Sequence, residues 1–284
     1  MPLAAAGAAR AQTAARSASL PPLIRTSCNL YSFNDPLQSG AMALGDVFDY
    51  CAELGFDAVD PTGYYFTGYP APPADAEIYR LKHRAFRLGI EISGTGVRND
   101  FTLPDRQRRD AEVAHVTRWI DVAAKLGAPV LRVFAGLAVP PDHTRDEVTE
   151  WVVQCLKTCA ARGAERGVMI VLQNHDDVYK TAEETLEIRR RVGSEWLGLN
   201  VDIGSLRTGD PYAETARLAP FAYTWQVKEL VYRNGKEEPT DLHAIVRILH
   251  ESGYRGYVPL ETLGAGDSKV KVRRLLQAFR DAMS

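Results

Sequence analysis

The sequence predicts an α/β fold, a single-domain (βα)8 barrel, and three observations support this. Short β-branched runs alternate with longer amphipathic stretches from Leu23 onward. Glycine recurs where a helix-like stretch gives way to the next strand, and polar side chains recur where the strands end. Strands that alternate with helices pair in parallel, and eight such units close into a barrel more readily than they form an open sheet.

The expected strands and the glycines before them can be read directly along the chain. We expect strands at Ile24–Tyr31, Phe56–Asp60, Ile90–Thr95, Val130–Phe134, Val168–Gln173, Leu197–Asp202, Phe221–Glu229 and Tyr257–Glu261. Six of them follow a glycine, namely Gly55, Gly89, Gly127, Gly167, Gly193 and Gly253. Glycine suits the end of a helix because the next residue often adopts a left-handed conformation that a Cβ atom disfavours. A doubly wound open sheet is the alternative, but no G-x-G-x-x-G motif follows the first strand.

Composition indicates a globular protein and argues against nucleic-acid-binding and membrane-spanning proteins. The chain has 284 residues, 45% hydrophobic and 25% charged, which is typical of a globular protein with a large core. A net charge of -2 with dispersed Lys and Arg predicts no nucleic-acid partner. No apolar run approaches the roughly 18 residues that cross a bilayer, so we expect no membrane partner. The four cysteines form no CxxC pair and are expected to be buried structural thiols.

Residues 1–22 are expected to lie outside the barrel, which we assign to residues 23–284. The Ala-rich stretch carries small residues at Ala9 and Ala11, as at the end of a signal peptide. The basic region and the full apolar stretch that normally precede such a site are missing. A start codon assigned too late would explain this and predict an exported protein, whereas the alternative is a tail on a cytoplasmic enzyme.

Polar residues gather at the carboxyl ends of the expected strands, where barrels of this type carry their active sites. They are Asn29, Asp60, Arg98, Asn99, Arg132, Gln173, Asn174, His175, Asp202, Gln226, Lys228, Glu229 and Glu261. A packed interior does not accept such groups unpaired, so we expect a functional site there.

Four of these residues end four successive strands and could converge. Gln173, Asp202, Gln226 and Glu261 each offer a carbonyl or carboxylate oxygen, which suits a hard divalent cation such as Mg2+ or Mn2+. The alternative is a hydrogen-bonded cluster in which the two amides satisfy Asp202 and Glu261 without a metal.

The second half of the chain resembles a known family. The matching segments are Val168–His175, Leu197–Leu206, Ala222–Glu229 and Gly253–Glu261. In this order they resemble the sugar phosphate isomerase/epimerase family of xylose isomerase-like TIM barrels. The resemblance implies one divalent metal, held by a Glu ending the fifth strand, an Asp ending the sixth, a His on the seventh and a Glu ending the eighth. By position, these places are taken here by Gln173, Asp202, Gln226 and Glu261.

Three residues depart from that pattern: the two glutamines, and Ser205 where the family usually has a His. These departures limit the reactions that the site can catalyse. Gln173 cannot act as a base, so Glu261 remains as the only carboxylate of the pair that trades protons in the family's epimerases. We therefore expect a single-base reaction next to a carbonyl, with the metal or Lys228 stabilising the enediolate. His175 is the alternative acid or base, because its reference pKa lies near neutrality.

The remaining strand-end residues are candidates for substrate binding. They are Asn29, Asp60, Tyr64, Arg98, Asn99, Arg132, Asn174 and Glu229. Arg98 and Arg132 could grip substrate oxygens or a phosphate, or form salt bridges within the barrel. Tyr64 opens an aromatic loop that could stack on a sugar face or cap the barrel. Alternation along the seventh strand points Lys228 inward with Gln226, and Glu229 to the other side.

The function we predict is isomerisation or epimerisation of a sugar or keto-sugar. One alternative is a lyase that cleaves 3-keto-glycosides by single-base elimination, and another is a non-catalytic sugar-binding barrel. The family that the chain resembles also includes an AP endonuclease type specialised for DNA. That function is disfavoured, because the resemblance implies a multi-metal site rich in His and Glu, which this sequence lacks. A small-molecule sugar is the expected binding partner. The exterior helices would also allow a homodimer, and the sequence does not decide between monomer and dimer.

Overall fold

A ring of parallel strands organises the molecule, which a computed structural model describes over residues 20–284. The strands are β1 (Leu23–Asn29), β2 (Ala58–Asp60), β3 (Glu91–Ile92), β4 (Thr95–Gly96), β5 (Val130–Val133), β6 (Met169–Gln173), β7 (Leu197–Asp202), β8 (Ala222–Lys228) and β11 (Arg255–Glu261). Their order in the sheet is β3-β2-β1-β11-β8-β7-β6-β5-β4. Because β3 and β4 are two parts of one chain segment, the two edges of this sheet meet and the barrel closes.

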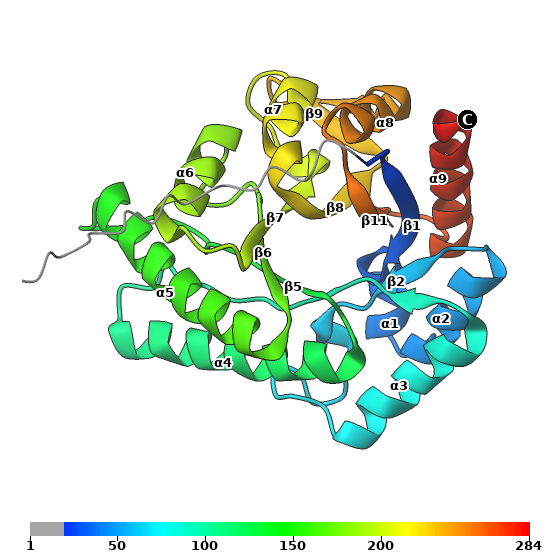
Figure 1. The fold of residues 1–284 in the computed structure, drawn as a ribbon, viewed down its shortest axis with the longest axis horizontal. Helices are drawn as coiled ribbons and strands as arrows, with labels where there is room; N and C mark the ends of the chain where they lie inside the picture. Colours follow the sequence, from blue (N-terminus) through cyan, green and yellow to red (C-terminus); the bar gives the residue numbers. More distant parts are fainter. Residues whose placement is uncertain (1–19) are drawn as a thin grey trace, which may run out of the picture.

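Helices surround the strands on the outside (Figure 1). The α-helices are α1 (Asn34–Gln38), α2 (Leu44–Glu53), α3 (Asp75–Leu88), α4 (Arg106–Leu126), α5 (Arg145–Arg166), α6 (Ala182–Val192), α7 (Pro211–Leu218), α8 (Leu242–Glu251) and α9 (Ser268–Met283). Single 3-10 turns occur at η1 (Leu30–Phe33), η2 (Gly63–Tyr65), η3 (Ile203–Ser205) and η4 (Ala219–Phe221). The predicted single-domain (βα)8 barrel is confirmed.

The six glycines before strands all adopt the left-handed conformation that their position predicts. Their φ angles are 78° at Gly55, 67° at Gly89, 80° at Gly127, 68° at Gly167, 65° at Gly193 and 65° at Gly253. Each glycine turns the chain from a helix back toward the sheet, where an L side chain would be strained.

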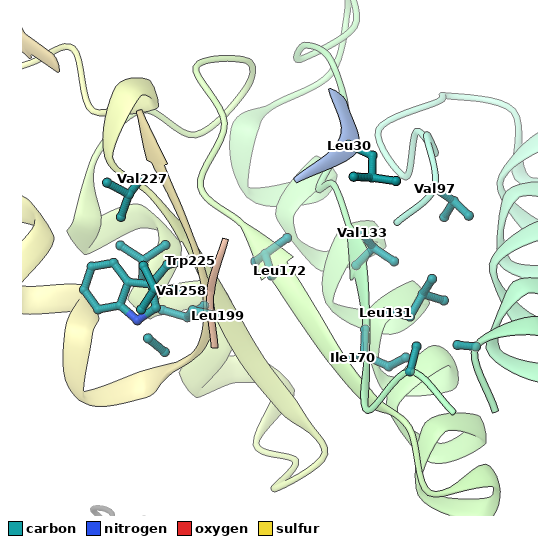
Figure 2. Close-up of a cluster of buried hydrophobic side chains, with 14 of the residues drawn as sticks. Leu30, Val97, Leu131, Val133, Ile170, Leu172, Leu199, Trp225, Val227 and Val258 are labelled. Atoms are coloured by element: carbon teal, nitrogen blue, oxygen red, sulfur yellow. The ribbon is translucent and has the colours of Figure 1, made fainter. Parts of the chain in front are cut away.

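Alternation along the strands separates an apolar outer face from a polar inner face. The outward side chains of β5 to β8 and β11 form an apolar layer, of which Figure 2 labels Leu131, Val133, Ile170, Leu172, Leu199, Trp225, Val227 and Val258. Each of these side chains is fully or almost fully buried. Burial of one such side chain contributes roughly 1.5–3 kcal/mol, so this layer stabilises the barrel while the inner face stays available for polar groups.

Three details differ from the predicted elements. The first strand ends at Asn29 because the chain turns into η1 there, and the third strand is broken into β3 and β4. The break lies at Gly94, where a Cβ atom would come within 2.7 Å of Val130 Cγ2. A hairpin of β9 (Leu230–Arg233) and β10 (Lys236–Pro239) follows β8 and was not predicted.

The predicted tail, with its signal-peptide and localisation alternatives, lies almost entirely outside the described residues. Within residues 20–284, none of the helices is both long and apolar enough to cross a membrane.

Candidate functional site

A cavity of about 610 Å3 opens at the carboxyl ends of the strands. This volume is within the range of small-molecule sites. Ten of the predicted site residues line it: Asn29, Tyr64, Arg98, Asn99, Arg132, Gln173, His175, Gln226, Lys228 and Glu261. The tertiary structure therefore brings most of the strand-end residues to one place, as the fold class predicts.

An ammonium group lies between the two buried carboxylates of the site. Lys228 Nζ is 2.7 Å from Asp202 Oδ2 and 3.2 Å from Glu261 Oε2. Lys228 points inward because it lies two residues after Gln226 on β8. The side chain of Lys228 is 12% exposed, against 0% for Asp202 and 5% for Glu261, so this is a buried ion-pair cluster.

The two glutamines belong to the same hydrogen-bonded cluster. Gln173 Nε2 donates to Asp202 Oδ2 at 2.7 Å and to Gln226 Oε1 at 2.6 Å. Gln173 Oε1 is buried and has no hydrogen-bond partner among residues 20–284. Ser205, on the 3-10 turn after β7, donates its Oγ hydrogen to the same Asp202 oxygen at 2.8 Å.

Charge and burial shift the pKa values of this cluster in opposite directions. Burial alone would raise the pKa of Asp202, but the charge and hydrogen bond of Lys228, with further contributions from His175 and Ser205, together outweigh burial and lower that pKa below the usual value. Burial raises the pKa of Glu261, and Lys228 offsets only part of that effect. Burial would lower the pKa of Lys228, but the two carboxylates raise it above its usual value. Lys228 is therefore charged, Asp202 is ionised, and Glu261 is the carboxylate that takes up a proton more readily.

A second polar cluster surrounds Arg132 on the neighbouring wall. Arg132 donates to Tyr64 Oη at 3.2 Å from both Nη1 and Nη2, and its Nη1 also donates to Val97 O at 2.6 Å. Gly96 allows this approach, because a Cβ there would lie 2.8 Å from the Arg132 guanidinium. The predicted role of Arg132 as a substrate grip stays a proposal, since its guanidinium already has protein partners.

Asp60 lies behind the cavity wall and is held by Asn29. Asn29 Nδ2 donates to Asp60 Oδ2 at 3.2 Å. Burial raises the pKa of Asp60 to about 6, against the opposing charge of Arg132. Asp60 does not line the cavity, so the structure places it behind Asn29 and Arg132 instead of at the substrate surface.

Two asparagines clamp neighbouring strands. Asn99 Nδ2 donates to Phe134 O at 2.8 Å, and its Oδ1 accepts from Phe134 N at 2.9 Å. Asn174 forms the same pair of bonds with the backbone of Asp202, at 2.8 and 2.9 Å. Both amides are used by backbone groups, so they position the ends of β5 and β7.

His175 has a carboxylate partner that the sequence reading missed. His175 Nδ1 lies 2.7 Å from Asp177 Oδ2, and both residues line the cavity. A carboxylate at Nδ1 orients the imidazole and leaves Nε2 for another partner. The H-x-D spacing was a signal that could have identified Asp177.

Glu229 lies away from the cavity, on the side that strand alternation predicts. Its carboxylate pairs with Lys271 at 3.4 Å and with Arg274 at 3.2 Å, both on α9. A substrate contact from Glu229 is therefore not supported by its position.

Apolar residues at the cavity were also missed from the sequence. Leu137, Leu263 and Tyr31 line the cavity and are 50%, 46% and 38% exposed. Tyr31 belongs to η1, and Leu137 and Leu263 belong to the loops after β5 and β11, so no local pattern in the sequence connects them.

The residues present do not fit the divalent ion that the resemblance implies. Asp202 already accepts four hydrogen bonds, from Gln173, Gly204, Ser205 and Lys228. Three of them end on Oδ2 and one on Oδ1, so a metal would have to compete with protein donors for Asp202, above all at Oδ2. Within residues 20–284, no three His, Cys, Asp or Glu side chains group so that they could hold a metal ion. The predicted ligand set of Gln173, Asp202, Gln226 and Glu261 does converge, but the Lys228 ammonium lies between its two carboxylates, and the glutamines are joined to each other and, through Gln173, to Asp202 by hydrogen bonds.

Comparisons with known proteins agree with this fold. The C-glycoside deglycosidase alpha subunit of Microbacterium trichothecenolyticum is 27% identical over 188 residues, which are 63% of this chain and 47% of that protein. The chain thus spans about half the length of this curated relative. The structure of D-psicose 3-epimerase in the presence of D-fructose superposes with a TM-score of 0.78 at 17% identity, over 91% of this chain and 99% of that one.

Two further solved structures have a similar fold. The 3-keto-D-glucoside 4-epimerase of E. coli matches with a TM-score of 0.72 and 15% identity, over 92% of this chain and 99% of that one. A xylose isomerase-like TIM barrel protein from Mycobacterium smegmatis, in complex with magnesium, has a TM-score of 0.67 and 19% identity over 94% and 98%. Metal-bound proteins therefore occur among the neighbours of this fold.

The family assignment rests on the sequence itself. The family model described as "Xylose isomerase-like TIM barrel" matches residues 48–282, which is most of the chain and includes Gln173, Asp202, Gln226, Lys228 and Glu261. The chain belongs to the xylose isomerase-like TIM barrel family.

Proposed function

We propose that this protein abstracts a proton next to the carbonyl group of a sugar or keto-sugar, and thereby isomerises or epimerises it, with Glu261 as the base. The observation that carries the proposal is the position of Glu261. It lines the cavity at the end of β11, and burial raises its pKa next to a fixed positive charge. A base whose pKa lies closer to neutrality abstracts a carbon-bound proton more effectively than an ordinary carboxylate.

Lys228 supplies positive charge where negative charge develops. An ammonium group has three hydrogens, of which two point to Asp202 and Glu261. Lys228 also lines the cavity, so its third hydrogen can donate to a substrate carbonyl oxygen. When Glu261 takes the proton, the electron pair moves onto that oxygen, and a preorganised cation stabilises the enediolate. Return of the proton from Glu261 to the neighbouring carbon, together with transfer of the hydroxyl proton from one enediolate oxygen to the other, completes the isomerisation.

The pair of His175 and Asp177 provides an acid at another wall of the cavity. Asp177 orients the imidazole through Nδ1, so Nε2 can exchange a proton with a substrate hydroxyl group or leaving group. Gln173 cannot supply this proton. His175 is therefore the proposed acid partner of Glu261.

A lyase is the second candidate, favoured by the single carboxylate base and by the curated relative named as a C-glycoside deglycosidase alpha subunit. In this reaction Glu261 removes the proton next to the keto group of a 3-keto-glycoside. The bond between sugar and aglycone then breaks, and His175 protonates the leaving group. The product is an unsaturated keto-sugar and a free aglycone.

A substrate screen in deuterated water tests both candidates with one set of proteins. We expect isomerase activity to introduce deuterium into the sugar without release of an aglycone, and lyase activity to release the aglycone. Glu261→Gln should lower the rate of whichever reaction is observed about a hundred- to ten-thousand-fold. Glu91→Gln is the matched control, since Glu91 is exposed on β3 at the opposite end of the barrel.

Two results would reject the proposal. Unchanged activity of Glu261→Gln would exclude Glu261 as the base. Binding of sugars without deuterium exchange or aglycone release would identify the protein as a non-catalytic sugar-binding barrel.

A further inference from the structure

The place where four strand-end side chains converge already contains a cation. Lys228 Nζ contacts one oxygen of Asp202 at 2.7 Å and one of Glu261 at 3.2 Å. Both carboxylates are almost completely buried, and they come from two different strands, β7 and β11. A single ammonium group thus joins the two acidic side chains at the centre of the barrel mouth.

We propose that the Lys228 ammonium permanently replaces the divalent ion of related barrels, and that Gln173 and Gln226 are the neutral partners that this replacement requires. Two carboxylates and one ammonium leave the cluster with one negative charge. A carboxylate at position 173 would add a second uncompensated negative charge in a buried place, which is costly. Gln173 instead donates hydrogen bonds to Asp202 and Gln226, so it stabilises the same geometry without adding charge.

The hydrogen bonds of Asp202 explain why a metal would not simply displace the lysine. Its Oδ2 accepts from Gln173 Nε2, Ser205 Oγ and Lys228 Nζ, and its Oδ1 accepts from Gly204 N at 3.0 Å. All four donors belong to the protein and are buried or nearly buried. A divalent ion would have to break several of these bonds and tolerate an ammonium group beside it.

Three residues carry this arrangement. Lys228 supplies the positive charge, Gln173 is neutral where the resemblance implies a Glu, and Gln226 presents an amide oxygen that accepts from Gln173. Neither amide nitrogen can act as a metal ligand, and amide oxygen is a weaker ligand for transition metals than imidazole nitrogen. Replacement of Gln173 by Glu and of Gln226 by His, with removal of the Lys228 ammonium, should therefore create a metal site that the natural protein lacks.

Metal binding measured without substrate tests this inference. It deepens the proposed function, but its readout does not depend on activity, so the two can fail separately. The natural protein and the variant Gln173→Glu/Gln226→His/Lys228→Ala are dialysed against Mn2+, freed of excess metal and examined by elemental analysis. We expect about one Mn2+ per chain in the triple variant and less than about one tenth in the natural protein.

Thermal denaturation with and without Mn2+ provides the second readout. A ligand that binds only the folded state raises the melting temperature, so Mn2+ should raise that of the triple variant and leave that of the natural protein unchanged. Lys236→Ala, at an exposed position on β10, is the control and should bind no Mn2+. If the triple variant folds only when Mn2+ is present, this dependence supports the proposal as well.

Two outcomes would overturn it. The first is a natural protein that retains about one metal ion per chain and loses melting temperature when a chelator removes that ion. The second is a folded triple variant that, like the natural protein, neither binds Mn2+ nor changes its melting temperature with it.

Discussion

Replacement of Lys228 by methionine should destabilise the protein strongly, because it removes the cation that lies between two buried carboxylates. The side chains of Asp202 and Glu261 are 0% and 5% exposed, so water cannot compensate for the lost ammonium. Breaking one buried ion pair typically costs about 3–5 kcal/mol. Methionine has a similar length and flexibility, so loss of packing adds little. We expect Lys228→Met to lower the free energy of unfolding by about 3–5 kcal/mol near pH 7.

The loss should become smaller as the pH falls. Without Lys228, burial and the charge of Asp202 raise the pKa of Glu261 further above its value in the unfolded chain. A group with a raised folded-state pKa stabilises the fold when protonated, and that stabilisation is lost as the pH rises through the folded-state pKa. The variant should therefore recover part of its lost unfolding free energy as the pH falls below 7, because a raised pKa lets Glu261 take up a proton more readily.

Urea denaturation followed by circular dichroism near pH 7 and near pH 5 measures both effects. Lys236→Met is the matched control, and its effect should stay within about 0.5 kcal/mol because Lys236 is exposed. A Lys228→Met protein within about 1 kcal/mol of the natural protein near pH 7 would refute the reasoning. A deficit that grows toward pH 5 would refute the assignment of Glu261 as the group that protonates.

Two further predictions concern single positions elsewhere in the barrel. Asp60 has a pKa of about 6 when buried and about 3.9 when unfolded, so the stability it contributes when protonated is lost as the pH rises from about 4 to about 6. In the natural protein the unfolding free energy should therefore fall by up to about 3 kcal/mol over that interval, and in Asp60→Asn this fall should be absent. Urea titrations at several pH values measure it, and the same dependence on pH in both proteins would contradict the prediction. Gly167→Ala should lower the free energy of unfolding by about 1 kcal/mol. Gly167 has a φ of 68°, where an L side chain strains the backbone. Apart from its chain neighbours, no atom of the described residues lies within 4 Å of the place a Cβ would take, so no steric clash adds to this strain. The urea midpoint measures this change, and an unchanged or higher midpoint would show that strain at this helix end is negligible.

Local patterns determined most of the barrel. The glycines at the helix ends could be recognised because a left-handed residue is required wherever a helix turns back to the sheet, and all six have positive φ. Strand alternation predicted that Lys228 points inward and Glu229 outward. Both expectations depend only on residues next to each other in the chain, so a sequence is sufficient for them.

Contacts between distant segments could not be read in the same way. Nothing near Glu229 in the sequence indicates Lys271 and Arg274 on α9 as its partners. The exposed apolar residues Leu137 and Leu263 meet at one cavity only because the barrel brings their loops together.

The polar cluster shows where the two kinds of information separate. Sequence by itself determined the barrel, the edge at which Gln173, Asp202, Gln226 and Glu261 meet, and the departure of two of them from the family pattern. Only the tertiary structure decided what lies between them. Lys228 occupies that place because hydrogen bonds and burial act over distances of a few ångströms in space, and residues from four strands must come together before those distances exist.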